Sequence, residues 1–350
     1  MIIYLVVSLM PLILSSFYFS RYKMTQYKKK QFLILYGILL VLFIGFRNRN
    51  IGSSDSLNYY NMFLDAIKTS SLRNFYNPNG VEIGFQLFLW IFSRFINNPQ
   101  WIFIISAIIY ITCISIFIYN NSDDVILSYT LYITLGLMIF MIQGMRQSIA
   151  MSICLLSFEF VKAKKFKQFL LFILLAMMFH QTAIVFIAVY FLLNLKIKVT
   201  HISTFLFFAF ISLFFINIII SYANKIFNRS YTDTADSGGF VAVAIYLLII
   251  IFDILFNKDL KRFQYESTFF YMLLLGFFSY IMRYVGALAA ERISFYFMFS
   301  QLIILPNTIT KLPLEEKRII RPLIYFFAIC LFVYRLRDSN LVPYRFFWEV

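Results

Sequence analysis

The feature that most constrains this chain is a series of apolar runs, each about 15 to 22 residues long, that recur along it. A helix needs about 20 apolar residues to cross the hydrocarbon core of a bilayer. Backbone groups within lipid must be paired inside the protein, which limits spanning segments to helices and closed barrels. The runs are continuous rather than alternating, which favours helices. The sequence therefore predicts an all-α polytopic membrane protein.

Composition agrees, because 61% of the residues are hydrophobic and only 13% are charged. Soluble domains usually carry about 25% charged residues. We expect about 10–12 transmembrane helices in a single integral membrane domain, residues 1–350. They are predicted near residues 2–20, 31–46, 100–119, 125–143, 147–161, 164–180, 182–196, 201–220, 240–256, 268–288, 293–310 and 319–334.

Two polar stretches, 47–81 and 221–239, are expected on the same, outer side of the membrane. The segment from Glu82 to Ile96 is short and carries Glu82, Gln86 and Arg94. It is predicted to be an interfacial or re-entrant helix. We therefore expect residues 47–99 to form the outer active-site loop, and 221–239 to form a second outer loop.

The net charge of +15 does not indicate nucleic-acid binding, because the charges are spread over short loops with no basic domain. In the predicted topology 14 of the 16 lysines are cytoplasmic, as the positive-inside rule expects. However, 11 of the 15 arginines are on the outer side. A guanidinium binds phosphate or carboxylate at two points, so these arginines indicate an anionic ligand at the outer face.

The strongest candidate site follows the predicted helix 31–46, where Arg47, Arg49, Asp55, Tyr59 and Tyr60 come close together in sequence. Arginine can bind phosphate, and tyrosine can stack on a sugar ring. The plain alternative is a solvated loop after a membrane helix.

Three more candidate residues lie at predicted outer helix ends. Arg146 and Gln147 open the helix predicted over 147–161, where a charge at the membrane boundary is often functional; the alternative is a snorkelling anchor. His180 lies at the polar break between two short apolar helices. Histidine has an unperturbed pKa near 6.5 and can accept a proton at neutral pH, although a packing histidine is the simpler reading.

Arg283 and Arg292 lie at the outer end of the helix predicted over 268–288 and in the turn after it. Arg283 is within the apolar run and is favoured as a ligand, while Glu291 is expected to pair with an arginine. The basic, aromatic C-terminal stretch 334–345 is also outer, with a disordered tail as the alternative. Only two histidines and no carboxylate pair are available, so no metal site is expected.

Four short motifs occur in a recognisable order. They are Arg47…Gly52…Asp55…Tyr59, then Glu82-Ile-Gly84-Phe85, then Arg146-Gln147…Ala150, and finally Ala176…Phe179-His180. Together they resemble the EpsG family, which comprises Wzy-like polymerases of bacterial O-antigen, capsule and exopolysaccharide. One departure is that two serines separate Gly52 from Asp55, where the family commonly has Gly-Thr-Asp.

The resemblance implies an inner-membrane enzyme, with a GT-C-like arrangement as one option for its helices. It would join oligosaccharide repeat units carried on undecaprenyl pyrophosphate at the outer face, without a cofactor, and with a chain-length regulator as a partner. In this hypothesis Arg146 and Arg283, with Arg47 or Arg49, hold the pyrophosphate, and Gln147 and Arg292 also contact substrate. Asp55 or His180 is the base, Glu82 is a second carboxylate candidate, and Tyr59 and Tyr60 stack on sugars.

Two other functions are considered. A lipid-linked oligosaccharide flippase should place cations along a path through its helices and show an internal repeat. Here the cations gather at one face and no repeat is visible, which favours an enzyme. An O-antigen ligase uses the same donor, and the sequence does not separate it from a polymerase. No phosphate-binding glycine motif is present, so the substrate must be activated elsewhere.

Overall fold

The computed structural model describes residues 1–19, 25–52, 54–77, 80–192, 218, 239–256, 264–285, 288–337, 339 and 341–349. Nearly all of the predicted helix 201–220 and of the loop 221–239 lies outside this part of the chain. Within it the chain is helical, and the isolated bridge between Arg47 and Phe346 belongs to no strand. The predicted all-α polytopic fold is confirmed.

The elements follow one another along the chain in the order below. They are α1 (Ile2–Phe19), α2 (Gln26–Gly45), α3 (Ser54–Lys68), α4 (Leu72–Phe75), α5 (Ile83–Ser93), α6 (Trp101–Asn121), α7 (Val125–Thr134), α8 (Leu137–Gln143), α9 (Met145–Lys162), α10 (Phe166–Phe179), the 3₁₀ helix η1 (Gln181–Ile187), α11 (Ala188–Leu192), α14 (Phe240–Phe256), α15 (Gln264–Ile281), the 3₁₀ helix η2 (Met282–Val285), α16 (Leu288–Met298), α17 (Gln301–Lys311) and α18 (Leu314–Arg337).

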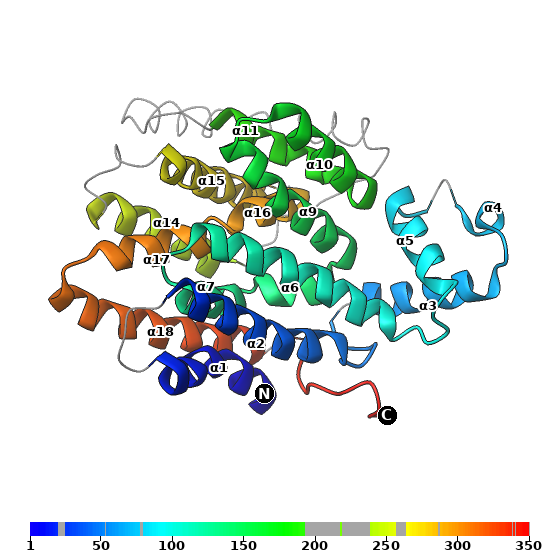
Figure 1. Ribbon diagram of the computed structural model, residues 1–350, viewed down its shortest axis with the longest axis horizontal. Coiled ribbons are helices and arrows are strands. Elements are labelled where there is room, and N and C mark those ends of the chain that lie inside the picture. The colour runs from blue at the N-terminus through cyan, green and yellow to red at the C-terminus, as the bar shows by residue number, and fades with distance from the viewer. Residues whose placement is uncertain are drawn as a thin grey trace.

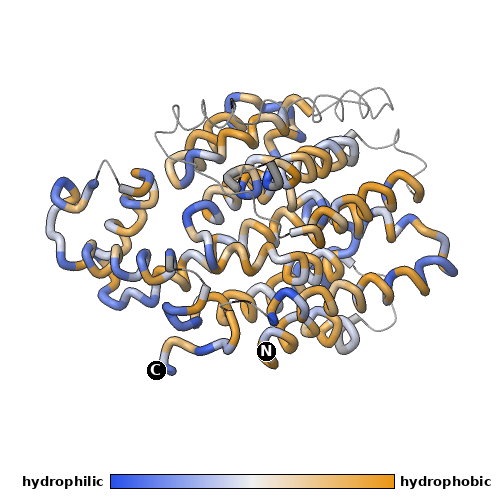
Figure 2. Tube along the Cα trace, turned by 180° about the vertical axis from the view of Figure 1, so that it is seen from behind, coloured by the Kyte–Doolittle hydropathy of each residue, from blue (hydrophilic) through white to orange (hydrophobic). Residues whose placement is uncertain are grey.

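The long helices lie side by side in a bundle, with α6 packed between α2 and α9 (Figure 1). The short helices α3, α4 and α5 project beyond one end of this bundle, on the right in Figure 1. Figure 2 shows that the bundle helices are largely hydrophobic, whereas α3 and α4 are more hydrophilic. We call the end with α3–α5 the site end.

At the opposite end, here called the lysine end, the start of α2 and the α6–α7 and α17–α18 connections lie together. Lys29 donates to the carbonyl of Ser122 over 3.2 Å. Arg321 pairs with Asp124 over 2.7 Å. Lysines follow at the neighbouring helix ends, near the start of α2, at the end of α9 and start of α10, and around the α17–α18 connection: Lys28, Lys29, Lys30, Lys162, Lys164, Lys165, Lys167, Lys311 and Lys317.

In the described residues, three helical stretches are long and apolar enough to span a membrane: Trp101–Asn121, Ala290–Lys311 and Leu314–Arg337. The second consists of α16 and α17 in series. The bent pair of α7 and α8 makes a fourth if counted as one span. Several other apolar helices, such as α10, are shorter. The chain is thus a multi-pass membrane protein, although its clear spans are fewer than the 10–12 expected.

The predicted unbroken helix 125–143 is wrong, because α7 and α8 meet at an angle of 52°. Gly136 separates them with a φ of +92°, a conformation that residues with a side chain rarely adopt. Arg335, from the end of α18, donates to the carbonyl of Leu135 over 2.6 Å. The break therefore leaves this carbonyl paired, although it lies within the bundle.

The polar stretch 47–81 is predicted to be a loop, but Ser54–Lys68 within it forms α3 and Leu72–Phe75 forms α4. The buried apolar side chains of α3, Tyr59, Phe63 and Ala66, recur at helical spacing. Asp55 in the first turn and Lys68 in the last turn suit the helix dipole. Tertiary burial of a narrow apolar face thus makes a helix from a mainly polar sequence.

The C-terminal segment is paired with the end of α2 rather than being a tail. Asn48 donates through its backbone to Arg345, and Phe347 to Phe46, each over 2.9 Å. The Tyr344 hydroxyl donates to the carbonyl of Phe43 over 2.5 Å. This segment holds in place the loop that leads into α3.

Candidate active site

Three charged or titratable side chains from distant parts of the sequence meet at the site end. Glu82 immediately precedes α5, His180 immediately follows α10, and Arg146 is the second residue of α9. One carboxylate oxygen of Glu82 pairs with the Arg146 guanidinium. The other lies 3.1 Å from Nδ1 of His180. Arg146 also donates through Nε to the Tyr59 hydroxyl, over 3.2 Å.

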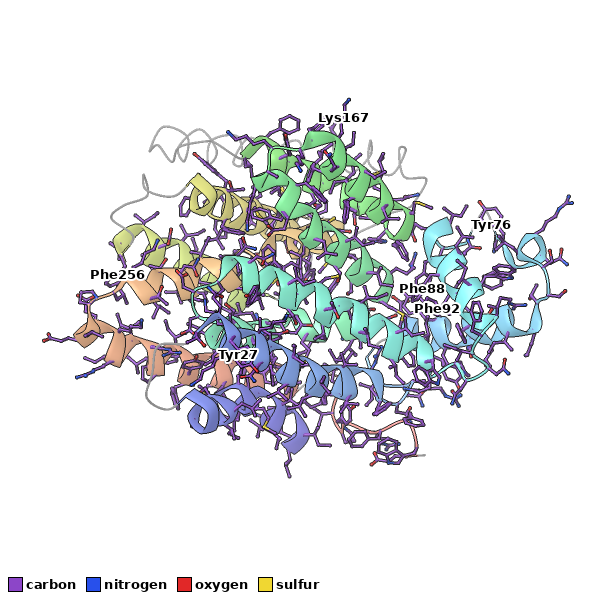
Figure 3. All side chains as sticks on the ribbon, viewed as in Figure 1. Tyr27, Tyr76, Phe88, Phe92, Lys167 and Phe256 are labelled. Atoms are coloured by element: carbon purple, nitrogen blue, oxygen red, sulfur yellow. The ribbon has the colours of Figure 1, made fainter. Side chains whose placement is uncertain are left out.

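The close packing of α5 on the end of α10 brings Glu82 to His180. A Cβ atom on Gly84 would lie only 2.6 Å from the carbonyl oxygen of Met178, so this approach requires glycine. On the next turn of α5, the ring of Phe88, labelled with Phe92 in Figure 3, lies 6.2 Å from that of Phe179. His180 has an extended backbone and ends α10 at this point.

The carboxylate of Glu82 is ionised in this environment. Burial raises its pKa, but the hydrogen bond from His180 and the charge of Arg146 outweigh burial, and the pKa falls to about 2. An ionised carboxylate only accepts hydrogen bonds, so Nδ1 of His180 must be the donor. In the neutral ring Nε2 is then the acceptor nitrogen. Burial also raises the pKa of Tyr59, which keeps its hydroxyl neutral.

A cavity of about 320 Å³ lies beside this cluster. It is lined by Asp55, Tyr59, Phe140, Gln143, Gly144, Arg146, Gln147, His180, Glu291, Arg292 and Phe295. Its walls come from α3, α8, α9, α16 and the end of α10. It is of the size of a small-ligand site.

Six of the predicted site residues line this cavity: Asp55, Tyr59, Arg146, Gln147, His180 and Arg292. Glu82 lies just behind the wall and contacts two of them. Gln147 donates to the backbone carbonyl of Arg292 over 2.6 Å, which joins α9 to α16.

Four other predicted residues do not line the cavity. Arg47 is 1% exposed, donates to the carbonyls of Ile44 and Ile142 over 2.6 and 3.2 Å, and lies over the Phe103 ring. Arg49 lies over the ring of Tyr60. Arg283 pairs with Glu291 over 2.7 Å, and so contacts a residue of the cavity wall.

Sequence reasoning missed the part of the wall formed by α8 and by Phe295 of α16. Phe140 and Phe295 stack there with ring centroids 3.9 Å apart. Gln143 and Gly144 follow on the same segment, which Arg47 braces through its bond to Ile142. Gln143 at the end of a long apolar run was the signal available. No group of three or more metal-ligating side chains occurs among the residues that the structure describes.

The fold and the site define a multi-pass helical membrane protein with a cavity at one end of its bundle that is lined by two arginines, two carboxylates and a histidine. The chain belongs to the EpsG family, whose model matches residues 29–346. This is a family of Wzy-like polysaccharide polymerases, so the predicted resemblance is confirmed. No curated protein and no solved structure matches the chain.

Proposed function

We propose that this protein transfers a growing glycan from undecaprenyl pyrophosphate onto the next lipid-linked repeat unit, at the outer face of the bacterial inner membrane. Membership of a polysaccharide polymerase family supports a glycosyl transfer that builds polymer. The observation that carries the rest is a histidine held by a buried carboxylate, in a cavity that two arginines also line.

His180 acts as the general base in this proposal. An acceptor sugar hydroxyl attacks the anomeric carbon of the donor glycan, and Nε2 of His180 takes its proton. The new carbon–oxygen bond forms while the bond to the pyrophosphate oxygen breaks. Undecaprenyl pyrophosphate leaves with the bonding electron pair. Glu82 positions the ring and stabilises the imidazolium that forms, but its own pairing with Arg146 makes it a poor proton acceptor.

Arg146 and Arg292 stabilise the charge that develops on the leaving pyrophosphate. Arg292 is exposed and makes no ion pair within the described part of the chain, so its charge is available to a ligand. The charge of Arg146 is partly offset by Glu82. We therefore assign the larger share of pyrophosphate binding to Arg292.

Asp55 and Tyr59 complete the cavity on the α3 side. The Asp55 carboxylate can accept hydrogen bonds from sugar hydroxyls and is the alternative base. Tyr59 presents a ring and a neutral hydroxyl, a combination that suits carbohydrate. The separation of this cavity from the lysine end supports the orientation, because lysine-rich ends usually face the cytoplasm.

The test is a reconstituted reaction with purified protein in liposomes and the host's undecaprenyl-pyrophosphate repeat unit. We expect a ladder spaced by one repeat, formed without ATP or nucleotide sugar. His180→Ala should abolish the ladder, while Arg73→Ala, which removes an exposed arginine from α4, should not. Repeat units that cross the membrane without being joined would indicate a flippase. Transfer only to a different acceptor would indicate a ligase. Either result would refute the proposal.

A further inference from the structure

A second hollow lies away from the site, on the outward-facing side of α2 and α6. It is a groove of about 610 Å³. Its lining residues lie between Lys30 and Leu42 on α2 and between Ile108 and Tyr119 on α6. It shares none of these with the cavity at the site end. The groove is therefore a separate feature of the fold.

The groove faces outward from the bundle. Ile34 is 51% exposed, Ile38 54% and Ile108 45%, and in a multi-pass protein such side chains contact lipid. Gly37 lies in its lining, where a Cβ atom would come within 3.3 Å of Ile111. The missing side chain thus lets α2 and α6 approach closely and leaves room above their contact.

The dimensions of the groove match one leaflet. From Lys30 to Leu42, α2 rises by about 18 Å at 1.5 Å per residue, and half of a hydrocarbon core is about 15 Å. One lipid chain could therefore lie along the groove from its headgroup end to the middle of the bilayer.

The two ends of the groove differ in charge. Lys30 is exposed at the lysine end, and Tyr119, near the last turn of α6, lies at the same end. The lining residues at the other end, around Leu42 and Ile108, are apolar. A cation beside a tyrosine is typical of the headgroup level of a membrane, and basic pockets there bind anionic lipid headgroups.

We infer that this groove binds one anionic phospholipid from the leaflet at the lysine end. One acyl chain fills the apolar length, and the headgroup phosphate pairs with the Lys30 ammonium. The lipid-linked sugar donor fits less well, because its pyrophosphate belongs at the opposite end of the bundle. The choice of a phospholipid over the sugar donor rests on the proposed function, whereas the groove and its charged end do not.

Native mass spectrometry of the purified full chain, titrated with phosphatidylglycerol and phosphatidylcholine, tests this. The wild type should retain one phosphatidylglycerol in preference to phosphatidylcholine. Lys30→Gln should reduce that preference about fivefold, the contribution of one basic residue near an anionic surface. Lys167→Gln removes an exposed lysine from the first turn of α10 (Figure 3) and should leave the preference for phosphatidylglycerol unchanged.

A second pair of variants tests the groove itself. Ile38→Trp should fill it and reduce retention of the lipid, whereas Leu248→Trp, at a side chain of α14 that is 66% exposed, should not. The inference is overturned if the wild type shows no preference, or if either variant behaves like its control. It is also overturned if the retained species is a polyprenyl phosphate or a second copy of the chain.

Discussion

Glu82 accepts a hydrogen bond from Nδ1 of His180 over 3.1 Å while its second oxygen pairs with Arg146. One buried carboxylate therefore orients a histidine and an arginine that line the same cavity. The pairing occupies both oxygens of Glu82, which distinguishes its role from that of the two other residues considered as the base, His180 and Asp55.

His180 and Glu82 should differ in what they contribute to the reaction. His180→Ala should lower kcat by about 10²- to 10⁴-fold, the usual loss for a general base. Glu82→Gln retains an acceptor for Nδ1 but loses the charge, so it should lower kcat less. Polymer formation from the purified lipid-linked substrate measures both. If Asp55→Asn abolishes activity while His180→Ala retains it, the base is Asp55.

Arg292 and Arg283 should also differ in how much they contribute to the reaction rate. Arg292→Ala removes a guanidinium that lines the cavity, and should lower kcat by about 10²- to 10³-fold, as the loss of one charge-stabilising donor does. Arg283 is not in the cavity lining and contacts it only through its pair with Glu291, so Arg283→Ala should cost less. Initial rates with Arg73→Ala as the control decide this. A larger loss of kcat in Arg283→Ala than in Arg292→Ala would contradict this assignment and place the pyrophosphate nearer Arg283.

Acid should destabilise the site only at low pH. The pKa of Glu82 is depressed from 4.5 to about 2, so its contribution to stability is present above pH 4.5 and is lost as the pH falls towards 2. Thermal unfolding of detergent-solubilised protein should show this loss. In Glu82→Gln the decline should be shallower across this range. An equally steep decline would mean that other groups cause it.

Gly84→Ala should loosen the junction between α5 and α10. The added Cβ would meet the backbone of Met178 at 2.6 Å, and overpacking of this kind costs about 1 to 3 kcal/mol. We expect a lower melting temperature and lower activity, because Glu82 and His180 lie on the two sides of this contact. Gly80→Ala, in the loop before α5, is the control. Unchanged activity in Gly84→Ala would show that the junction does not position the histidine.

Arg335→Met should destabilise the break between α7 and α8. It leaves the carbonyl of Leu135 without its donor, a loss of about 1 to 3 kcal/mol for a buried acceptor. Arg337→Met, two residues further along α18 and exposed, should have little effect on the melting temperature. Equal melting temperatures for the two variants would exclude a bracing role for Arg335.

Much of the site could be predicted from the sequence, because charged and polar residues are few in a chain that is 61% hydrophobic. Arg146, Gln147 and His180 were found where apolar runs begin or end, and the cavity gathers all three. Which of the outer arginines line the cavity could not be predicted. Arg47 is buried and donates to the carbonyl of Ile142, 95 residues away in the sequence. No local sequence pattern predicts such a contact.

The helices followed a similar rule. Continuous apolar runs predicted α6 and α18, whose burial in lipid depends mainly on composition. The helix α3 was missed because its apolar face is narrow and lies in a polar stretch. The sequence does not predict the break at Gly136, because a single glycine is tolerated in many helices. The left-handed backbone of Gly136 and the bond from Arg335 to the carbonyl of Leu135 are visible only in the structure.

The pairing of Phe346 with Arg47 also has a consequence for biogenesis. These residues are far apart in sequence, and Arg47 in turn holds Ile142 beside the cavity. During synthesis the loop before α3 emerges early, but its partner segment follows α18 and is made after all the other helices that the structure describes. The cavity wall is thus held in place late, so a chain still being inserted should be inactive until α18 and the segment after it are in place.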